Sequence, residues 1–172
     1  PESDEAYPVS ASDKREQLNQ LLATGNPTLA AAVTSLENFD YYKSVQGLDG
    51  LKLPGEDARN KQYKEIELLL QGQPVPQEIP GEPQIDPNTG QPVIDPMTGQ
   101  PLMSPPQQIE VTSYPIEQIT DDHDTEFKAC QAWLNSDEGW EMKQSNPPGH
   151  KNVVLHAQDH FNALMASQPP GG

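Results

Sequence analysis

The sequence has little of what a compact enzyme domain needs. Only 33% of its 172 residues are hydrophobic and 6% are aromatic, against roughly 45–50% apolar residues, glycine included, in ordinary globular domains. No stretch approaches the roughly 18 consecutive apolar residues that span a membrane, and no charged segment followed by an apolar one has the form of a signal peptide. We therefore expect no membrane partner, and small helical clusters instead of one large core.

Cysteine is almost absent. A single residue, Cys130, cannot form an intramolecular disulfide, and no zinc-type Cys/His spacing surrounds it, which fits a reducing compartment. Cys130 lies between Phe127 and Trp133 in an expected amphipathic helix, the setting of a small buried side chain and not of an activated thiolate. Serine-nucleophile elbows, phosphate-binding loops and dinucleotide-binding glycine patterns are also missing. We expect a protein that is not an enzyme, without catalytic or cofactor-binding residues.

Basic residues are scarce. Ten lysines and arginines face 26 acidic residues, which gives a formal net charge of −16. A surface of this sign repels phosphate and disfavours tight nucleic-acid binding. It permits a protein that double-stranded DNA passes closely without adhering, and it favours protein partners, including further copies of the same chain. Because the chain begins at Pro1 and not at a methionine, we also expect a piece of a longer protein.

Three parts are expected along the chain, and together they predict a mainly α fold. Small helical clusters are separated by a proline-rich insertion that forms β-hairpins. The first part, residues 8–73, carries leucine faces at helical spacing, and Gly25, Gly47 and Gly72 end its helices. The last of these helices is expected over residues 56–71.

The second part, residues 74–106, contains ten of the nineteen prolines and no lysine or arginine. It holds a nine-residue repeat, IDPNTGQPV followed by IDPMTGQPL. In each copy Asp accepts local backbone hydrogen bonds, Pro presets the first turn dihedral and Gly takes the positive φ that reverses the chain. We expect hairpin turns at Asp86, Gly90, Asp95 and Gly99. Two interpretations stay open: a linker or protruding hairpin pair, and a ribbon on which a protein partner docks.

The third part, residues 107–168, is expected to start with a short strand over residues 109–114 and to continue as helices. One helix is predicted to begin at Thr120 or Asp121, where acidic residues suit the helix dipole. We expect a compact three-helix cluster whose core holds these side chains: Phe127, Trp133, Trp140, Val153 and Phe161.

Three of the four histidines form the main metal-ligating pattern. His156 and His160 lie four residues apart on one helix face, a spacing that can chelate zinc or another divalent ion, and His123 lies among aspartates at another helix start. If the two helices pack antiparallel, a His/His/Asp site with the adjacent Asp159 is geometrically open. The alternative is that the histidines cap helices or bond the backbone across the bundle. Since Ala157 stands where zinc proteases carry a glutamate and spacing fixes no third ligand, we expect no bound metal.

Short strings follow one another in a set order over most of the chain. They are Pro8-Val9-Ser10; Gly47-Leu48; Leu53-Pro54-Gly55-Glu56-Asp57-x-Arg59-x-Lys61; Glu65-Ile66-Glu67-Leu68-Leu69; Gly72-Gln73-Pro74-Val75-Pro76; Asp121-Asp122-His123; Trp133-Leu134-Asn135-Ser136-Asp137-Glu138-Gly139; Asn146-Pro147-x-Gly149; Asn152-Val153; and His156-x-x-x-His160. In this order they resemble the C-terminal region of portal proteins from tailed bacteriophages and prophages. None of the strings is a catalytic signature.

The resemblance implies a structural protein. Portals of this family are ring-shaped oligomers at one capsid vertex; DNA enters and leaves through them, and packaging and head-completion proteins dock on them. Their C-terminal region forms a helical crown or barrel, which implies a place in the virion after assembly in the host cytoplasm. The nine-residue repeat has no counterpart that we can match to the family. Two other classes stay open: an acidic protein-binding adaptor or scaffolding module, and a small metal-dependent enzyme using His123, His156 and His160.

Overall fold

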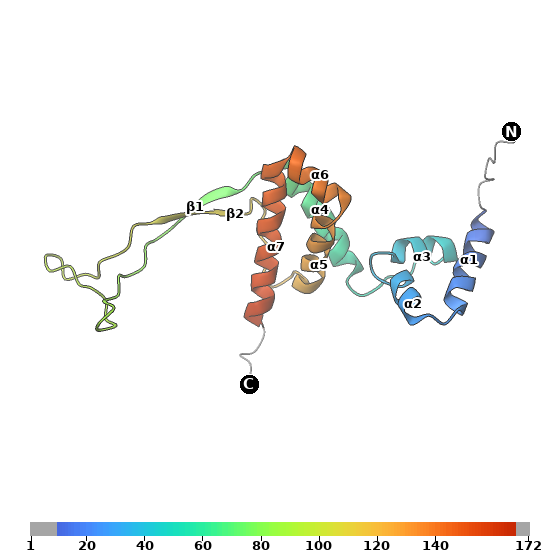
Figure 1. Ribbon diagram of the computed structural model, residues 1–172, viewed down its shortest axis with the longest axis horizontal. Coiled ribbons are helices and arrows are strands. Elements are labelled where there is room, and N and C mark those ends of the chain that lie inside the picture. The colour runs from blue at the N-terminus through green and yellow to red at the C-terminus, as the bar shows by residue number, and fades with distance from the viewer. Residues whose placement is uncertain (1–9, 168–172) are drawn as a thin grey trace. The chain divides into compact units, whose positions relative to one another are not determined.

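The computed structural model describes residues 10–167, in which seven helices and a two-stranded antiparallel sheet are found (Figure 1). This arrangement confirms the predicted mainly α fold with a small hairpin insertion. The chain divides into two compact units, with the boundary between Asp57 and Ala58. Pro8 and Val9, which open the first string of the resemblance, lie outside the described residues. Within residues 10–167, no helix is both long and apolar enough to cross a membrane.

The first unit contains helices α1 (Ala11–Ala23), α2 (Pro27–Val33) and α3 (Phe39–Gln46). A reciprocal capping box starts α1: the Asp13 N–H donates to the Ser10 hydroxyl, and the Ser10 N–H donates to the Asp13 carboxylate. Asn26 caps α2, whose first residue Pro27 has no N–H to leave unpaired. Gly47 ends α3 with a φ of 73°, as its position in the sequence predicts.

The core of the first unit is small. Its buried apolar residues are Leu18, Phe39 and Val45. A buried ion pair supports it, because the Lys43 ammonium lies 2.5 Å from one Glu56 carboxylate oxygen while the other oxygen accepts the Leu53 N–H at 3.0 Å. The Glu56 contact outweighs partial burial and raises the pKa of Lys43 above its ordinary value. Among the described residues, the buried Lys43–Glu56 pair therefore adds to a few apolar contacts in supporting the unit.

The second unit contains the rest of α4 (Glu56–Gln71), together with α5 (His123–Leu134), α6 (Asp137–Ser145) and α7 (Pro147–Ser167). The Asp122 carboxylate accepts the Thr125 N–H and so caps α5, which places the helix start at His123 and not at Thr120 or Asp121. Ser136 caps α6 in the same way by accepting the Gly139 N–H at 3.1 Å.

The core of the second unit joins three helices. It consists of Ile66 and Leu69 on α4, Cys130 and Trp133 on α5, and Val153 and Ala157 on α7. The sequence division at residue 73 grouped α4 with the N-terminal part, whereas the apolar face of α4 packs here. Trp133 and Val153 are buried as predicted, and Phe127 is partly buried at the edge of this core.

Two of the predicted core residues lie elsewhere. Trp140 is 68% exposed and Phe161 is 41% exposed. The short helix α6 approaches α5 through Gly139, where an added Cβ would lie 2.2 Å from the Trp133 carbonyl oxygen, so its neighbour Trp140 faces outward. Phe161 pairs with Phe127 at a ring-centroid distance of 5.5 Å, outside the closed core.

A two-stranded ribbon leaves the second unit between α4 and α5 (Figure 1). Strand β1 (Val75–Ile79) pairs antiparallel with β2 (Gln107–Val111), with Ile79 opposite Gln107. The predicted strand over residues 109–114 therefore lies at residues 107–111, and β1 was not predicted because Pro76 made its segment resemble a linker. An edge strand tolerates proline because one side of the backbone needs no partner.

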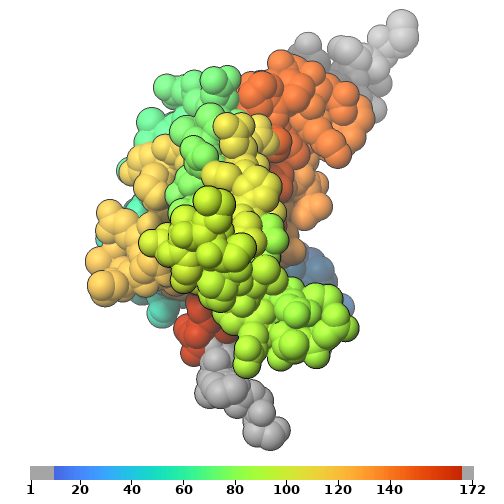
Figure 2. Space-filling model, turned by 90° about the vertical axis from the view of Figure 1, so that its left-hand side faces the viewer, coloured from blue at the N-terminus to red at the C-terminus, as the bar shows by residue number. Residues whose placement is uncertain are grey.

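The nine-residue repeat forms two hairpin turns of the same design. In the first, the Gly90 N–H donates to the Asp86 carbonyl at 2.8 Å, and Gly90 takes a φ of 66°. In the second, Gly99 and Asp95 repeat this contact at 2.8 Å with a φ of 70°. The predicted turns are thus confirmed, while docking at these hairpins stays a prediction. Figure 2 shows the two hairpins as separate lobes.

Candidate functional site

The helices α4, α5 and α7 each bury a stripe at positions i, i+3, i+4 and i+7. The stripes are Gln62, Glu65, Ile66 and Leu69 on α4; Glu126, Ala129, Cys130 and Trp133 on α5; and Gly149, Asn152, Val153, His156, Ala157 and His160 on α7. Polar residues occupy part of each stripe. Four of these polar residues, Glu65, Glu126, His156 and His160, lie close together. With their neighbours Lys61, Asp121 and His123 they are named the polar junction.

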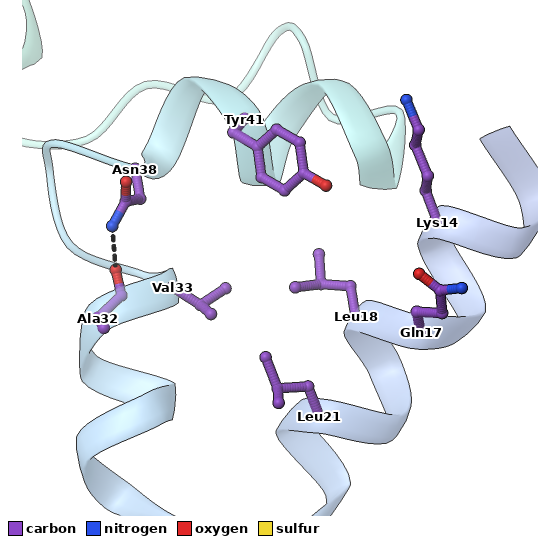
Figure 3. A pocket seen from close by; sticks show the side chains of 8 residues that line it. All are labelled: Lys14, Gln17, Leu18, Leu21, Ala32, Val33, Asn38 and Tyr41. Carbon is purple, nitrogen blue, oxygen red and sulfur yellow. Dashed lines mark hydrogen bonds between the residues drawn. The ribbon is translucent and has the colours of Figure 1, made fainter. Parts of the chain in front are cut away.

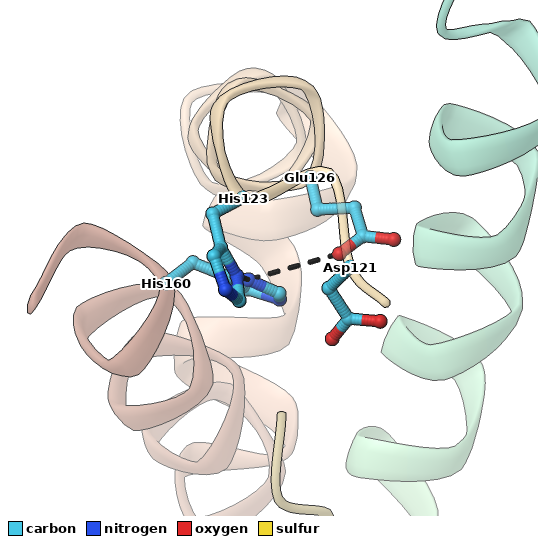
Figure 4. A group of neighbouring side chains, drawn as sticks. All are labelled: Asp121, His123, Glu126 and His160. Atoms are coloured by element: carbon cyan, nitrogen blue, oxygen red, sulfur yellow. Dashed lines mark hydrogen bonds and ion pairs between the residues drawn. The ribbon is translucent and has the colours of Figure 1, made fainter. Parts of the chain in front are cut away.

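The three histidines of the polar junction form a chain of ring contacts. His123 Nδ1 lies 2.9 Å from His160 Nδ1, and His160 Nε2 lies 3.1 Å from His156 Nε2. At one end of the chain His156 Nδ1 lies 2.8 Å from the Tyr114 carbonyl oxygen, and at the other His123 Nε2 lies 3.3 Å from the Gln118 carbonyl oxygen. Figure 4 shows the His123 and His160 rings side by side, facing Asp121 and Glu126.

Two buried carboxylates face this chain without a hydrogen bond. Glu65 Oε2 lies 3.5 Å from His156 Nε2, and Glu126 Oε2 lies 3.7 Å from His160 Nδ1. Glu65 is 5% exposed and Glu126 is 1% exposed, yet neither Oε2 atom has a hydrogen-bond partner. A buried oxygen that lacks a partner loses its hydration without replacement, so it is a strong point of attraction for a cation.

The other oxygens of these carboxylates contact Lys61. Its ammonium lies 3.3 Å from Glu65 Oε1 and 3.4 Å from Glu126 Oε1, and it also pairs with Asp121. Although burial opposes it, the contact with Asp121 and the charges of Glu65 and Glu126 raise the pKa of Lys61. Three carboxylates thus share one ammonium.

The protonation states follow from this packing. Burial, followed by the nearby His156, lowers the pKa of His160 to about 4, so the ring is neutral at pH 7. Burial and the Asp121 charge raise the pKa of Glu126 to about 7. Burial also opposes ionisation of Glu65, but the His156 ring and the Lys61 charge outweigh it and lower the pKa of Glu65. A neutral histidine and an ionised carboxylate are the forms that bind a metal ion.

A second polar contact set closes the C-terminal end of α4. Asn152 Nδ2 donates to the Leu69 carbonyl at 2.9 Å, and Asn146 Nδ2 donates to the Leu70 carbonyl at 2.8 Å. The Ser113 N–H in turn donates to Asn152 Oδ1 at 2.8 Å. These asparagines satisfy carbonyls that a helix end leaves without intrahelical partners, and they fix α4 and the segment after β2 against α7.

The structure brings together the three histidines that the sequence singled out. Asp159, the proposed partner, is outside the polar junction; the carboxylates there come from Asp121, Glu126 and Glu65. The backbone bonds expected under the alternative interpretation are also present, at His156 and at His123. Glu65 was missed, although its place in the α4 stripe beside Ile66 and Leu69 was a signal for burial.

Cys130 is fully buried beside the polar junction. Burial, with the charges of Glu65 and Glu126, raises the pKa of its thiol to about 12. The thiolate is the reactive form of cysteine, so this residue packs as a small apolar side chain, as predicted.

The first unit contains a pocket of about 400 Å³. Its lining, drawn in Figure 3, is Lys14, Gln17, Leu18, Leu21, Ala32, Val33, Asn38 and Tyr41. The Asn38 amide donates to the Ala32 carbonyl at 2.9 Å. Lys14 is the one charged side chain of the lining, and no acid–base pair converges there. The lining of this pocket is therefore better suited to binding an apolar side chain than to catalysis.

Comparison of the chain with protein-family models, with curated proteins and with solved structures gave no match.

Proposed function

We propose that this chain is the C-terminal part of a portal subunit of a tailed bacteriophage or prophage. In this role it is a structural module and not an enzyme. Its partners are neighbouring copies of the same chain in a ring and the head, packaging or head-completion proteins of the phage. Its place is the capsid vertex of the virion, after assembly in the host cytoplasm.

One observation carries the proposal. The strings on which the resemblance rests lie far apart in the sequence, yet many of their residues form one connected buried region. Glu65 and Leu69 on α4, Trp133 on α5, and Asn152 and His160 on α7 are all buried. The strings thus meet in one packed region, and this common packing is what supports treating them as one pattern.

The glycines of these strings support the same argument. At Gly149 an added Cβ would lie 2.8 Å from the Leu70 carbonyl oxygen, and at Gly72 it would lie 2.7 Å from Ser113 Oγ. Both positions are therefore close approaches between α4 and the segments that pack on it. Gly72 ends α4 without a positive φ, so its role is space and not backbone conformation.

The negative net charge of the chain is consistent with a surface along which DNA passes without binding. With a formal net charge of −16, the chain offers phosphate no gain from counterion release. In a fluorescence-anisotropy titration at about 0.15 M salt, we expect no saturable binding of duplex DNA up to about 10⁻⁴ M protein, the weak end of non-specific binding. The control is the same titration at lower salt. Micromolar or tighter binding that weakens as salt rises would contradict the proposal.

The second candidate function is an acidic protein-binding adaptor or scaffolding module. The ribbon favours it, because several apolar side chains are exposed there: Ile85, Ile94, Met97, Leu102 and Met103. Met97, at the tip of the second hairpin, is 93% exposed, whereas the same position of the first hairpin holds Asn88. An adaptor of this kind would be a stable monomer with one tight heterologous partner.

A further inference from the structure

We propose that the polar junction binds one divalent transition-metal ion, with zinc as the preferred metal and Glu65, His156 and His160 as its protein ligands. The ligand atoms are the Nε2 atoms of the two histidines and Oε2 of Glu65. Ligand atoms of these three residues lie within 4.8 Å of one another, and all three residues are buried. The ion would join α4, which carries Glu65, to α7, which carries both histidines.

The distances fit a zinc ion. Zinc binds histidine nitrogen and carboxylate oxygen at about 2.0–2.2 Å, so two ligands of a tetrahedral site lie about 3.3 Å apart. His156 Nε2 lies 3.1 Å from His160 Nε2 and 3.5 Å from Glu65 Oε2. Three protein ligands of the His/His/Glu type leave a fourth position for a water molecule.

The hydrogen bonds around the histidines fit the same ion. A carbonyl oxygen only accepts, so His156 Nδ1 carries the proton that it shares with Tyr114, and its Nε2 holds the lone pair. With the ion on both Nε2 atoms, His160 Nδ1–H donates to His123 Nδ1, and His123 Nε2–H donates to the Gln118 carbonyl. Every ring nitrogen then has a partner and all three rings are neutral. Outer hydrogen bonds of this kind orient metal-binding histidines.

Without an ion the same contacts conflict as long as His156 is neutral. His160 must then donate from Nε2 to His156 Nε2, and His123 must donate from Nδ1 to His160 Nδ1. This leaves a lone pair on His123 Nε2 directed at the Gln118 carbonyl unless His123 is charged. It also leaves the lone pair of His156 Nε2 facing Glu65 Oε2, which has no hydrogen-bond partner. A cation between these acceptors, either a metal ion or a proton on His156 Nε2, removes both conflicts, and the zinc titration below distinguishes the two.

The charge of the junction fits a divalent ion. When all three carboxyls are ionised, Glu65, Asp121 and Glu126 contribute three formal negative charges and Lys61 one positive charge, and an arriving cation favours the ionised form of Glu126. A divalent cation compensates the remaining two charges. Two neutral imidazoles among the ligands favour zinc and related transition metals over magnesium or calcium, which prefer oxygen ligands.

The test uses the full 172-residue chain after treatment with a chelator and dialysis into metal-free buffer. We expect isothermal titration with zinc to give one ion per chain, magnesium to give no binding at the same concentrations, and cobalt(II) to give the visible absorption bands of a site with imidazole ligands. A chain that takes up no zinc and gives no cobalt bands would overturn the proposal.

Variants identify the ligands. Glu65→Gln keeps the shape of the side chain and, like His160→Gln, should weaken zinc binding by more than the roughly 10- to 100-fold typical of an outer-shell partner, whereas His123→Gln should lose about that factor. The matched control is His150→Gln, on the same helix and outside the junction, which should bind as the unchanged chain does. Circular dichroism checks that each variant folds.

Two results of this series would overturn the proposed ligand set. One is binding by Glu65→Gln and His160→Gln that equals binding by the control. The other is loss of binding in His123→Gln with Glu65→Gln unaffected, because the ion would then use the neighbouring group of Asp121, His123, Glu126 and His160.

Discussion

At the scale of single residues, some polar members of the buried stripes connect elements of the second unit through hydrogen bonds. Asn152 is the clearest example, since it is fully buried and its amide contacts the Leu69 carbonyl and both the N–H and the hydroxyl of Ser113. The Asn152 side chain on α7 thus supplies hydrogen-bond partners both to the C-terminal end of α4 and to the backbone after β2. Removing it leaves buried polar groups without partners, which is more costly than losing a surface contact.

We predict that Asn152→Ala lowers the free energy of unfolding of the second unit by about 1–3 kcal/mol, the range for buried polar groups that lose their partners. Both tryptophans of the sequence lie in this unit, and Trp133 is buried, so tryptophan fluorescence in a urea titration reports its unfolding. The matched control is Asn162→Ala, an exposed position on the same helix, with an expected change within about 0.5 kcal/mol. Equal effects of the two substitutions would contradict the role of Asn152.

The sequence predicted single residues with uneven success. Helical periodicity identified Trp133 and Val153 as buried, but size alone placed Trp140 in the core, and the close approach at Gly139 turns that side chain outward. Glu65 and Glu126 escaped prediction because charged residues are rarely buried. Their places at i, i+3, i+4 and i+7 with apolar residues were a usable signal. Which carboxylate meets which histidine depends on tertiary packing, which spacing along the chain does not fix.

At the scale of elements, local chemistry determined most boundaries. The cap residues, the glycine after α3 and the two turns of the repeat could be predicted from the sequence, because each depends on neighbours within a few residues. Strand β1 was not, since its partner lies some thirty residues on and only the pairing of Val75 with Val111 through Ile79 with Gln107 defines it. The place of α4 in the second unit could not be predicted either, because it depends on tertiary packing against α5 and α7.

We predict that the hairpins can be removed without unfolding the helices. In the described part of the chain, the backbone hydrogen bonds of residues 82–104 stay within this segment. Ile79 lies opposite Gln107, so an Asn-Gly turn can replace residues 80–106 and join the two strands directly. The tryptophan unfolding transition of the shortened chain should match that of the full chain within about 0.5 kcal/mol. A loss of several times that amount would show that the hairpins support the helical core.

At the scale of the whole molecule, charge and composition constrain the function more than any single motif does. The chain is polar and strongly acidic, and its second unit combines a small core with a buried polar junction and an exposed ribbon. These properties suit a module that is completed by neighbouring protein surfaces. The portal proposal and the adaptor proposal share this requirement, and they differ in whether the neighbour is another copy of the chain.

The mass of the 172-residue chain in solution, measured by light scattering over a series of protein concentrations, tests this difference most directly. The portal proposal predicts a mass that rises with concentration above the 18.9 kDa of one chain, towards a ring-sized species. A mass that stays at 18.9 kDa over the whole series would contradict the claim that these residues carry an interface between subunits, and would favour the adaptor.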